Sequence, residues 1–363
     1  MAEITRRDTL KKIGATGLSL SALATSTFPK PAIAQGNTTI TVSTWGGVTE
    51  EGIRKLVQPK FEKLTKASIL YDIGGQGARY NKLLAQRASP PADVFFSTDE
   101  AVVSAYQQGI LVPASRKNIP NAANVAERMM SVKIGTDNST ISGVPYTIIA
   151  YLLAFNPKTV TTRPTSWADM WRPEFANKFA FASPVHTQMP SFVIIAAELA
   201  GGSIDNIDPG FKKLAELRPS KLTVFWTDWA ALYKSGDVIA ATEFSYYLET
   251  MKAQNYDIDY VNPSDKGIAV PEYASIVKGT KKQELSEVFL NLMLDPEVQT
   301  DFARFTFQGP TNNLVHLPDD IAGKCTYGPI IDQLRFFDPQ VLATNRPLWT
   351  ERMNTQVVPH WRA

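Results

Sequence analysis

The segment 141–157 constrains the fold of this chain more than any other stretch of the sequence. It is apolar, β-branched and aromatic almost throughout, and Pro145 and Pro157 stand near its two ends. Proline disrupts a helix interior, whereas β-branched and aromatic side chains fit the pleated surface of a sheet. The segment is also longer than an ordinary strand of about 5 to 6 residues. We therefore predict a buried strand pair, or one long strand, that leaves one lobe of the protein and enters another.

A second segment, 256–278, is expected to bring the chain back. Two apolar, β-branched runs flank a polar turn within it. Two crossings between lobes form a hinge with a cleft above it, and clefts at domain junctions are where ligands bind. We predict a discontinuous first lobe, residues 35–147 with 269–363, and a continuous second lobe, residues 148–268.

The first 34 residues have the features of an export signal. Two adjacent arginines, Arg6 and Arg7, precede a mild apolar run, and a pattern of small residues suited to cleavage ends at Ala34. The weak apolar run favours the twin-arginine route. An ordinary secretory signal and an uncleaved anchor are the alternatives, but the glycines and serines of the run make it too polar to span a bilayer comfortably. We expect a periplasmic protein, cleaved after Ala34.

Composition is that of an ordinary globular protein with two domains. The 363 residues are 44% hydrophobic and 20% charged, with a formal net charge of +2, which gives no reason to expect nucleic acid as a partner. The single cysteine, Cys325, has no internal partner for a disulfide, so packing must supply the stability. No later apolar run is long enough for a transmembrane helix, and we expect a soluble, exported protein.

Alternating strand and helix patterns predict an α/β fold in both lobes. In the first lobe, strands are expected at 38–45, 67–73 and 92–97, with helices at 50–65, at 80–86 and up to Gln108. In the second lobe, strands are expected at 178–182, 222–226 and 238–244, with helices at 189–199, 211–217, 228–234 and 245–254. The tail beyond Pro318 is expected to form short helices on the first lobe.

In sheets of this kind, ligands bind at the loops beyond the carboxyl ends of the strands. Those loops and the crossings contain aromatic rings, carboxylates and small polar residues. The candidate ligand-binding residues are Trp45, Gly46, Gly75, Gln76, Thr98, Asp99, Tyr146, Ser183, His186, Thr187, Trp226, Asp228, Glu243, Tyr246 and Glu272. A ring face attracts an ammonium group, and a carboxylate adds a charge-assisted hydrogen bond, so the set suits an organic cation.

Simpler roles remain open for several of these residues. Asp228 could cap its own helix, and Glu272 could be a solvated or hinge-pairing carboxylate. Gly46 and Gly75 could be plain turn residues. The loops containing these glycines would still expose N–H groups able to hold an anionic or hydroxylated end of a ligand.

The sequence gives little support to catalysis. The three histidines, His186, His316 and His360, lack metal-ligand spacing, and nothing argues that Cys325 is a nucleophile. Neither a nucleophile elbow nor a phosphate-binding loop occurs. We predict a protein that is not an enzyme and that needs no cofactor or metal.

Several stretches together resemble a known family. They are residues 40–47, the third strand 92–97, Gly143-Val144-Pro145-Tyr146 at the crossing, 164–171, and Leu294-Asp295-Pro296-Glu297-Val298-Gln299. In their order and spacing they resemble a periplasmic solute-binding protein of an ABC importer over nearly the whole mature chain. The resemblance is to the subgroup that includes the spermidine/putrescine receptors, with iron(III), thiamine and phosphonate receptors as more distant cousins.

This resemblance implies a type II fold of two α/β lobes that close about a hinge on a small-molecule solute. It also implies permease subunits as partners, and we expect the receptor itself to be a monomer. Polyamine receptors of this kind hold the ligand between rings and carboxylates, which carries over to Trp45, Trp226, Asp228, Glu243 and Tyr246. The uncharged donors of the 183–188 loop suit a zwitterionic or hydroxylated amine, such as an opine-like conjugate, nearly as well.

Two alternatives stay open. Adjacent Tyr246 and Tyr247 resemble the tyrosine pair with which some iron(III) receptors bind the metal. However, Trp45 stands where such receptors can place a histidine, and Gln76 stands where a carboxylate would help. The second alternative is an exported enzyme on the same scaffold, because a fold does not dictate a function.

Overall fold

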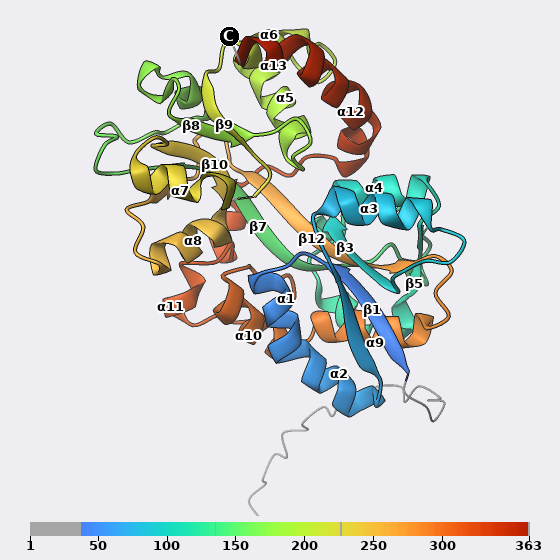
Figure 1. Cartoon of the computed structure of the whole chain (residues 1–363). Coiled ribbons are helices and arrows are strands. Elements are labelled where there is room, and N and C mark those ends of the chain that lie inside the picture. Colours follow the sequence, from blue (N-terminus) through green and yellow to red (C-terminus); the bar gives the residue numbers. More distant parts are fainter. Residues whose placement is uncertain (1–37, 135, 226, 362–363) are drawn as a thin grey trace, which may run out of the picture. The chain divides into compact units, whose positions relative to one another are not determined.

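The computed structural model describes residues 38–134, 136–225 and 227–361. The predicted export signal and Trp226 lie outside them. The centre of the sheet is formed by two long strands, β7 (Val144–Phe155) and β12 (Ile268–Val277), whose residues are all buried. They pair antiparallel, with Ile268 opposite Tyr151 and Ala274 opposite Val144. The segment around 141–157 is therefore one long strand, and the returning segment pairs directly with it (Figure 1).

The pattern of burial on β7 explains why its sequence is a continuous apolar run. Ile148, Ala150 and Leu152 pack in one hydrophobic cluster, whereas Ile149 and the alternate residues after it pack in another. Successive side chains of a strand point to opposite faces, so a strand buried on both faces needs apolar residues throughout. The full sheet has the order β2 (Ser68–Ile73), β1 (Thr39–Thr44), β3 (Val94–Thr98), β12, β7, β10 (Ala240–Phe244), β8 (Phe179–Ala182) and β9 (Pro219–Thr223). In addition, β4 (Leu111–Val112) pairs with β12, and β11 (Asp259–Val261) pairs with β7.

The first half of the sheet has the predicted alternation of strands and helices. β1 (Thr39–Thr44) pairs in parallel with both β2 (Ser68–Ile73) and β3 (Val94–Thr98). The helices are α1 (Val48–Gly52), a π-helical turn (Ile53–Val57), α2 (Gln58–Thr65), α3 (Gln76–Ala85) and α4 (Asp99–Gln107). The π turn lies just before Pro59, where a proline ring would clash with an ordinary helical turn.

A small two-stranded sheet and three short 3₁₀ turns lie between β4 and β7 in the chain. The sheet pairs β5 (Ala114–Ser115) antiparallel with β6 (Thr140–Ile141), and the three turns lie between these two strands in sequence. The turns are Arg116–Asn118, Pro120–Asn124 and Glu127–Met129.

The second half repeats the alternation. β8 (Phe179–Ala182) pairs in parallel with β9 (Pro219–Thr223) and β10 (Ala240–Phe244), and β10 runs antiparallel to β7. The helical elements are the 3₁₀ turns Trp167–Trp171 and Pro173–Phe175, α5 (Met189–Leu199), α6 (Asp208–Ala215), α7 (Thr227–Ser235) and α8 (Ser245–Ala253). The predicted α/β architecture is confirmed in both halves.

The chain after β12 is divided between the two halves. α9 (Gln283–Met293) and α10 (Pro296–Thr306) contribute Phe289 and Phe302 to the cluster that contains the β1 side chains. They are followed by α11 (Asp319–Ala322), a 3₁₀ turn (Gly328–Gln333), α12 (Pro339–Arg352), a π turn (Met353–Val357) and α13 (Val358–Trp361).

The prediction that the whole tail covers the first lobe was wrong for its last helices. Trp349 of α12 and Trp361 of α13 pack in the same cluster as Phe192 of α5 and Phe211 of α6. The indole of Trp361 also donates to the backbone oxygen of Leu214 at 2.7 Å. Figure 1 shows α12 and α13 beside α5 and α6. α13 and the Trp349 side of α12 are therefore buried on the second half, whereas Ala343 of α12 packs in a cluster with Val102 of α4 in the first half. The exact lobe boundaries stay a prediction.

Within the described part of the chain, no helix is both long enough and apolar enough to cross a membrane.

Candidate ligand-binding site

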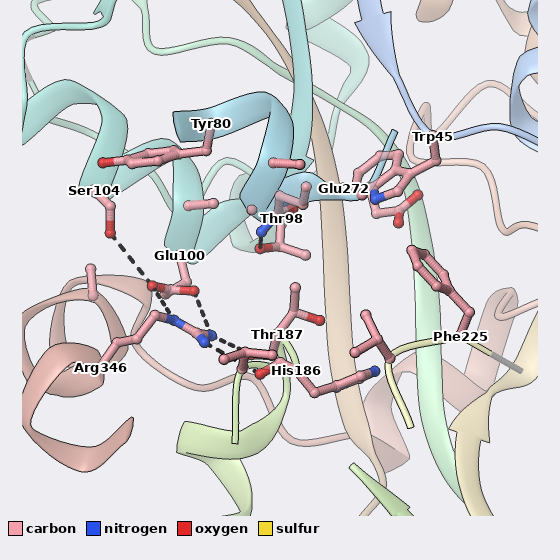
Figure 2. Close-up of a pocket in the computed structure, with 18 of the residues that line it drawn as sticks. Trp45, Tyr80, Thr98, Glu100, Ser104, His186, Thr187, Phe225, Glu272 and Arg346 are labelled. Atoms are coloured by element: carbon pink, nitrogen blue, oxygen red, sulfur yellow. Dashed lines mark hydrogen bonds and ion pairs between the residues drawn. The ribbon is translucent and has the colours of Figure 1, made fainter. Parts of the chain in front are cut away.

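A cavity of about 560 Å³ opens where the carboxyl ends of the parallel strands from both halves meet. Its lining comes from the loops after six strands, from β12, from one side of α4, and from α12. The principal lining residues are Trp45, Gly75, Gln76, Tyr80, Thr98, Glu100, Ser104, Gln107, Val185, His186, Thr187, Phe225, Phe244, Tyr246, Tyr247, Glu272 and Arg346 (Figure 2). A cavity of this size suits a small organic molecule.

The structure brings together about half of the predicted ligand-binding residues. Those that line the cavity are Trp45, Gly75, Gln76, Thr98, His186, Thr187, Tyr246 and Glu272. Those that do not line it are Gly46, Asp99, Tyr146, Ser183, Asp228 and Glu243. Trp226 lies outside the described residues, although its neighbour Phe225 lines the cavity.

Two of the predicted residues outside the cavity serve buried hydrogen bonds instead. One carboxylate oxygen of Glu243 accepts the indole N–H of Trp229 at 3.0 Å, and the other accepts the backbone N–H of Phe244 at 2.9 Å. The hydroxyl of Tyr146 donates to Glu272 at 2.8 Å. Tyr146 therefore supports a lining residue without reaching the cavity itself.

Three other predicted residues, Asp228, Asp99 and Ser183, have polar groups that either hold a loop of the site in place or lie behind it. Asp228 accepts the N–H groups of Val224 and Phe225 at 2.8 and 2.9 Å, which ties down the loop that presents Phe225. Asp99 accepts the N–H of Glu100 and faces a separate small cavity behind α4. The hydroxyl of Ser183 is buried without a hydrogen-bond partner among the described residues. A side chain added at Gly46 would point at Ile73, 3.0 Å away.

Glu272 is the most unusual group of the cavity wall. It is 5% exposed, and burial raises its pKa to about 7, against the opposing effects of the Tyr146 hydrogen bond and the charge of Arg79. At neutral pH this carboxyl group is therefore close to half ionised. A cation placed beside it would favour the ionised form.

Arg79 places a fixed positive charge behind the same wall. Its side chain is 2% exposed and donates to the backbone oxygens of Gly74, Ser43 and Phe96. Burial lowers its pKa to about 10, so it remains charged at neutral pH. The guanidinium carbon lies 5.0 Å from the ring centre of Trp45, so this arginine supports the ring as well as opposing the charge of Glu272.

Aromatic groups from the second half face this end of the cavity. The ring centres of Tyr246 and Tyr247 lie 4.0 Å apart. Phe225 crosses to the first half, where an added Cβ at Gly75 would lie 3.4 Å from its ring. The ring of Phe225 therefore lies within van der Waals reach of the loop that precedes α3. Figure 2 shows Trp45, Glu272 and Phe225 on one side of the cavity.

His186 contributes an uncharged ring. Burial, and secondly the charge of Arg346, lower the pKa of His186 to about 3. Its Nδ1 accepts the N–H of Gln188 at 3.1 Å, which assigns the ring proton to Nε2. The ring is therefore a neutral donor at physiological pH.

An ion pair closes the other end of the cavity. Nε and Nη2 of Arg346 each lie 2.8 Å from a carboxylate oxygen of Glu100. The same guanidinium donates to the backbone oxygens of His186 at 3.3 Å and Thr187 at 2.6 Å. Tyr80, Ser104 and the pair lie together on that side in Figure 2.

Sequence reasoning missed several lining residues, and only some left a signal. Glu100, Ser104 and Gln107 repeat at helical spacing on α4, so a search for a polar helix face could have found them. Arg346 lies 246 residues from its partner Glu100 in sequence, and no local pattern marks it.

The described residues contain no cluster of the usual metal ligands to which Tyr246 and Tyr247 could add. In the described ranges, no three or more histidine, cysteine, aspartate or glutamate side chains are grouped so as to hold a metal ion. Burial raises the pKa of both Tyr246 and Tyr247 far above the neutral range, which favours the phenol over the phenolate that binds iron(III).

Comparison with known proteins identifies the family of this chain. Residues 60–325 match the family model described as bacterial extracellular solute-binding protein. A periplasmic protein of Salmonella typhimurium named for binding 2-aminoethylphosphonate is 25% identical over 284 residues, covering 74% of this chain and 78% of that protein. Spermidine/putrescine-binding periplasmic protein 1 of Haemophilus influenzae is 23% identical over 314 residues, with 84% of each chain covered.

Solved structures show the same architecture. An ABC transporter protein from Clostridium perfringens aligns with a TM-score of 0.72 and 27% identity, covering 88% of this chain and 99% of that one. The glucopine complex of MotA from Agrobacterium tumefaciens aligns with a TM-score of 0.71 and 18% identity, with the same coverage. These relatives are transport proteins that bind solutes outside the cytoplasm, and they share the two-lobed α/β fold. The chain belongs to the bacterial extracellular solute-binding proteins, the family of receptors that serve ABC transporters.

Proposed function

We propose that this protein captures a small zwitterionic amine and delivers it to the permease of an ABC importer. The observation that carries the proposal is the buried carboxyl group of Glu272 in the cavity wall, with aromatic rings of both halves around it. Trp45 and Phe225 provide ring faces for an ammonium group, and Glu272 provides a charge-assisted hydrogen bond.

The charges of the cavity favour a zwitterion over a polyamine. Of the two carboxyl groups that line the cavity, Glu100 is already neutralised by Arg346, so Glu272 is left for a ligand. A second ammonium group would find no other carboxylate among the described lining residues. Arg79 behind the wall further disfavours a polycation and favours a solute that also carries an anionic group.

The start of α3 supplies a place for that anionic group. Gly75, Gln76 and Gly77 line the cavity, and no side chain caps the N-terminus of this helix. Free N–H groups at a helix start bind carboxylate and phosphonate oxygens. The Salmonella typhimurium relative is named for 2-aminoethylphosphonate, a solute with this charge pattern.

The far end of the cavity has room for an uncharged polar tail. Tyr80, Ser104 and Gln107 line it with a hydroxyl, a second hydroxyl and an amide. A hydroxylated substituent on the amine, as in an opine-like conjugate, would meet these groups. We therefore propose an amino acid or aminophosphonate head, with the additional volume available to a neutral tail.

In this proposal the chain is exported by the twin-arginine route, cleaved after Ala34, and acts as a monomer in the periplasm. Closure of the two lobes about β7 and β12 buries the solute and completes the surface that the permease recognises. Such a cycle requires only that the solute bind the closed form more tightly than the open form.

A calorimetric panel on the purified protein tests the proposal. The panel comprises 2-aminoethylphosphonate, γ-aminobutyric acid, glucopine, spermidine and iron(III). We expect a zwitterion to bind at least tenfold more tightly than spermidine. Tightest binding by spermidine would establish a polyamine receptor, and a visible-absorbing iron complex without amine binding would establish a metal receptor. Turnover of a bound solute would show that the protein is an enzyme.

A further inference from the structure

Arg346 makes a connection between the two halves of the molecule that solute binding alone does not require. It lies on α12, which contacts both sides of the cleft. Leu342 and Trp349 of this helix pack in the cluster of the second half, whereas Ala343 packs in a cluster with Val102 and Val103 of α4. The helix is further anchored to the second half through the ion pair between Arg352 and Asp208 at 2.7 Å.

The hydrogen bonds of Arg346 divide between the same two sides. Two of them go to the backbone oxygens of His186 and Thr187, in the loop between β8 and α5 of the second half. These carbonyl groups orient the guanidinium without neutralising its charge. Its Nε and Nη2 then point at the carboxylate of Glu100, on α4 of the first half, as a two-pronged pair.

Separating Arg346 from Glu100 would cost free energy because the carboxylate of Glu100 is buried. Glu100 is 3% exposed, and both members line the cavity beside the loop that carries His186. A buried carboxylate that loses its partner is strongly destabilised unless water reaches it. Separation of the two halves would have to break this contact or pull Arg346 away from the two carbonyl groups.

We infer that Arg346 is a positioning residue for solute capture: held by the carbonyl groups of His186 and Thr187, it docks on Glu100 and so sets how fully the cleft closes, with or without solute. This deepens the proposed function, on which its effect on solute affinity rests. α12 therefore acts as a strap that is anchored to the second half and fastens on the first.

Small-angle scattering of the ligand-free protein tests the strap without any solute. Arg346→Met keeps the length of the side chain and removes its charge and donors. We expect the radius of gyration of the ligand-free variant to rise measurably above that of the wild type. Arg335→Met is the matched control, because Arg335 forms a similar two-pronged pair with Glu198, at 2.8 Å for one prong, outside the cavity. It should leave the radius unchanged.

Solute binding provides the second measurement, with 2-aminoethylphosphonate as the probe. Arg346→Met should weaken binding at least tenfold, mainly through faster dissociation in stopped-flow. Combining it with Glu100→Gln should cost little more than either change alone, because both remove one interaction. Thermal melts of each variant identify loss of folding, and Arg346→Lys, which keeps the charge but not the two-pronged geometry, should give an intermediate dissociation rate.

Charge reversal distinguishes a contact that also depends on the carbonyl groups of His186 and Thr187 from an ion pair that depends only on opposite charges. In the double variant Glu100→Arg/Arg346→Glu, the new carboxylate would face the oxygens of His186 and Thr187, which cannot donate to it. We expect no rescue of compactness or of dissociation rate. Full rescue, or an Arg346→Met protein as compact as the wild type, would overturn the inference. If no amine binds any form but Arg346→Met still expands the free protein, the proposed function fails and the strap stands.

Discussion

Replacing Glu272 by glutamine should abolish a pH dependence that the wild-type protein shows between pH 6 and pH 8. Burial raises the pKa of Glu272 to about 7, and only the ionised carboxylate attracts an ammonium group. With that pKa, the ionised fraction is about one-eleventh at pH 6 and about ten-elevenths at pH 8. Because the apparent dissociation constant varies inversely with the competent fraction, it should fall about tenfold over this interval.

The same variant should weaken binding at pH 8 by an amount set by one charged hydrogen bond. Such a bond contributes about 1.5 to 3 kcal/mol, which corresponds to a loss of roughly 10- to 150-fold in affinity. Glutamine has nearly the shape of the carboxyl group, and its amide oxygen can still accept the hydroxyl of Tyr146. The loss therefore reports the charge of Glu272 rather than a disrupted wall.

Titration calorimetry at pH 6, 7 and 8, in buffers of different ionisation enthalpy, measures both quantities together with the proton released. At pH 7 about half a proton should leave per solute bound by the wild type and none by Glu272→Gln. Glu243→Gln is the matched control, because burial also raises the pKa of Glu243 to about 7 but the side chain does not line the cavity. Wild-type affinity that does not change between pH 6 and pH 8, or a slope that survives in Glu272→Gln, would refute the reasoning.

Trp45→Ala should weaken amine binding at least tenfold in the same calorimetric assay, because it removes a ring face beside the carboxyl group of Glu272. Trp171→Ala removes a ring that lies away from the cavity and whose indole donates to the backbone oxygen of Lys213, so it should lower the melting temperature but not the affinity. Equal affinity losses in the two variants would contradict the assignment. Compared with the wild type, Glu243→Gln should be more stable at pH 8 than it is at pH 5. The raised pKa means that the folded protein keeps a proton that the unfolded chain releases above about pH 4.5, so the wild type loses up to about 3 kcal/mol as the pH rises to 7 and beyond. Chemical denaturation at both pH values measures this, and an identical difference from wild type at each would count against it.

The strands and helices of this protein follow closely from local sequence patterns. The predicted helix at 189–199 coincides with α5, and the strand predicted at 178–182 is β8 within a residue. These segments have one clear period each, and their ends carry proline, glycine or a change of polarity. The unbroken apolar run of β7 likewise signals a strand buried on both faces.

Local patterns also located the loops of the site but not which side chains enter it. Glu243 and Glu272 are both acidic residues within apolar strands, and sequence reasoning favoured Glu243, whereas it left a solvated or hinge-pairing role open for Glu272. The alternation of side chains along each strand and their packing partners place the two carboxyl groups differently. Glu243 accepts the indole N–H of Trp229, whereas Glu272 lines the cavity. A shift of one residue along a strand reverses the face, so small errors in register decide such assignments.

The sequence by itself determined the α/β alternation, the double crossing and the general position of the site, because each depends on residues that are neighbours in the chain. Tertiary structure alone decided that α12 packs on both halves and that Arg346 meets Glu100. It also decided that Phe225 reaches the loop at Gly75. Such contacts join side chains that are far apart in sequence, and their energy depends on burial and relative orientation, which no short stretch of residues encodes.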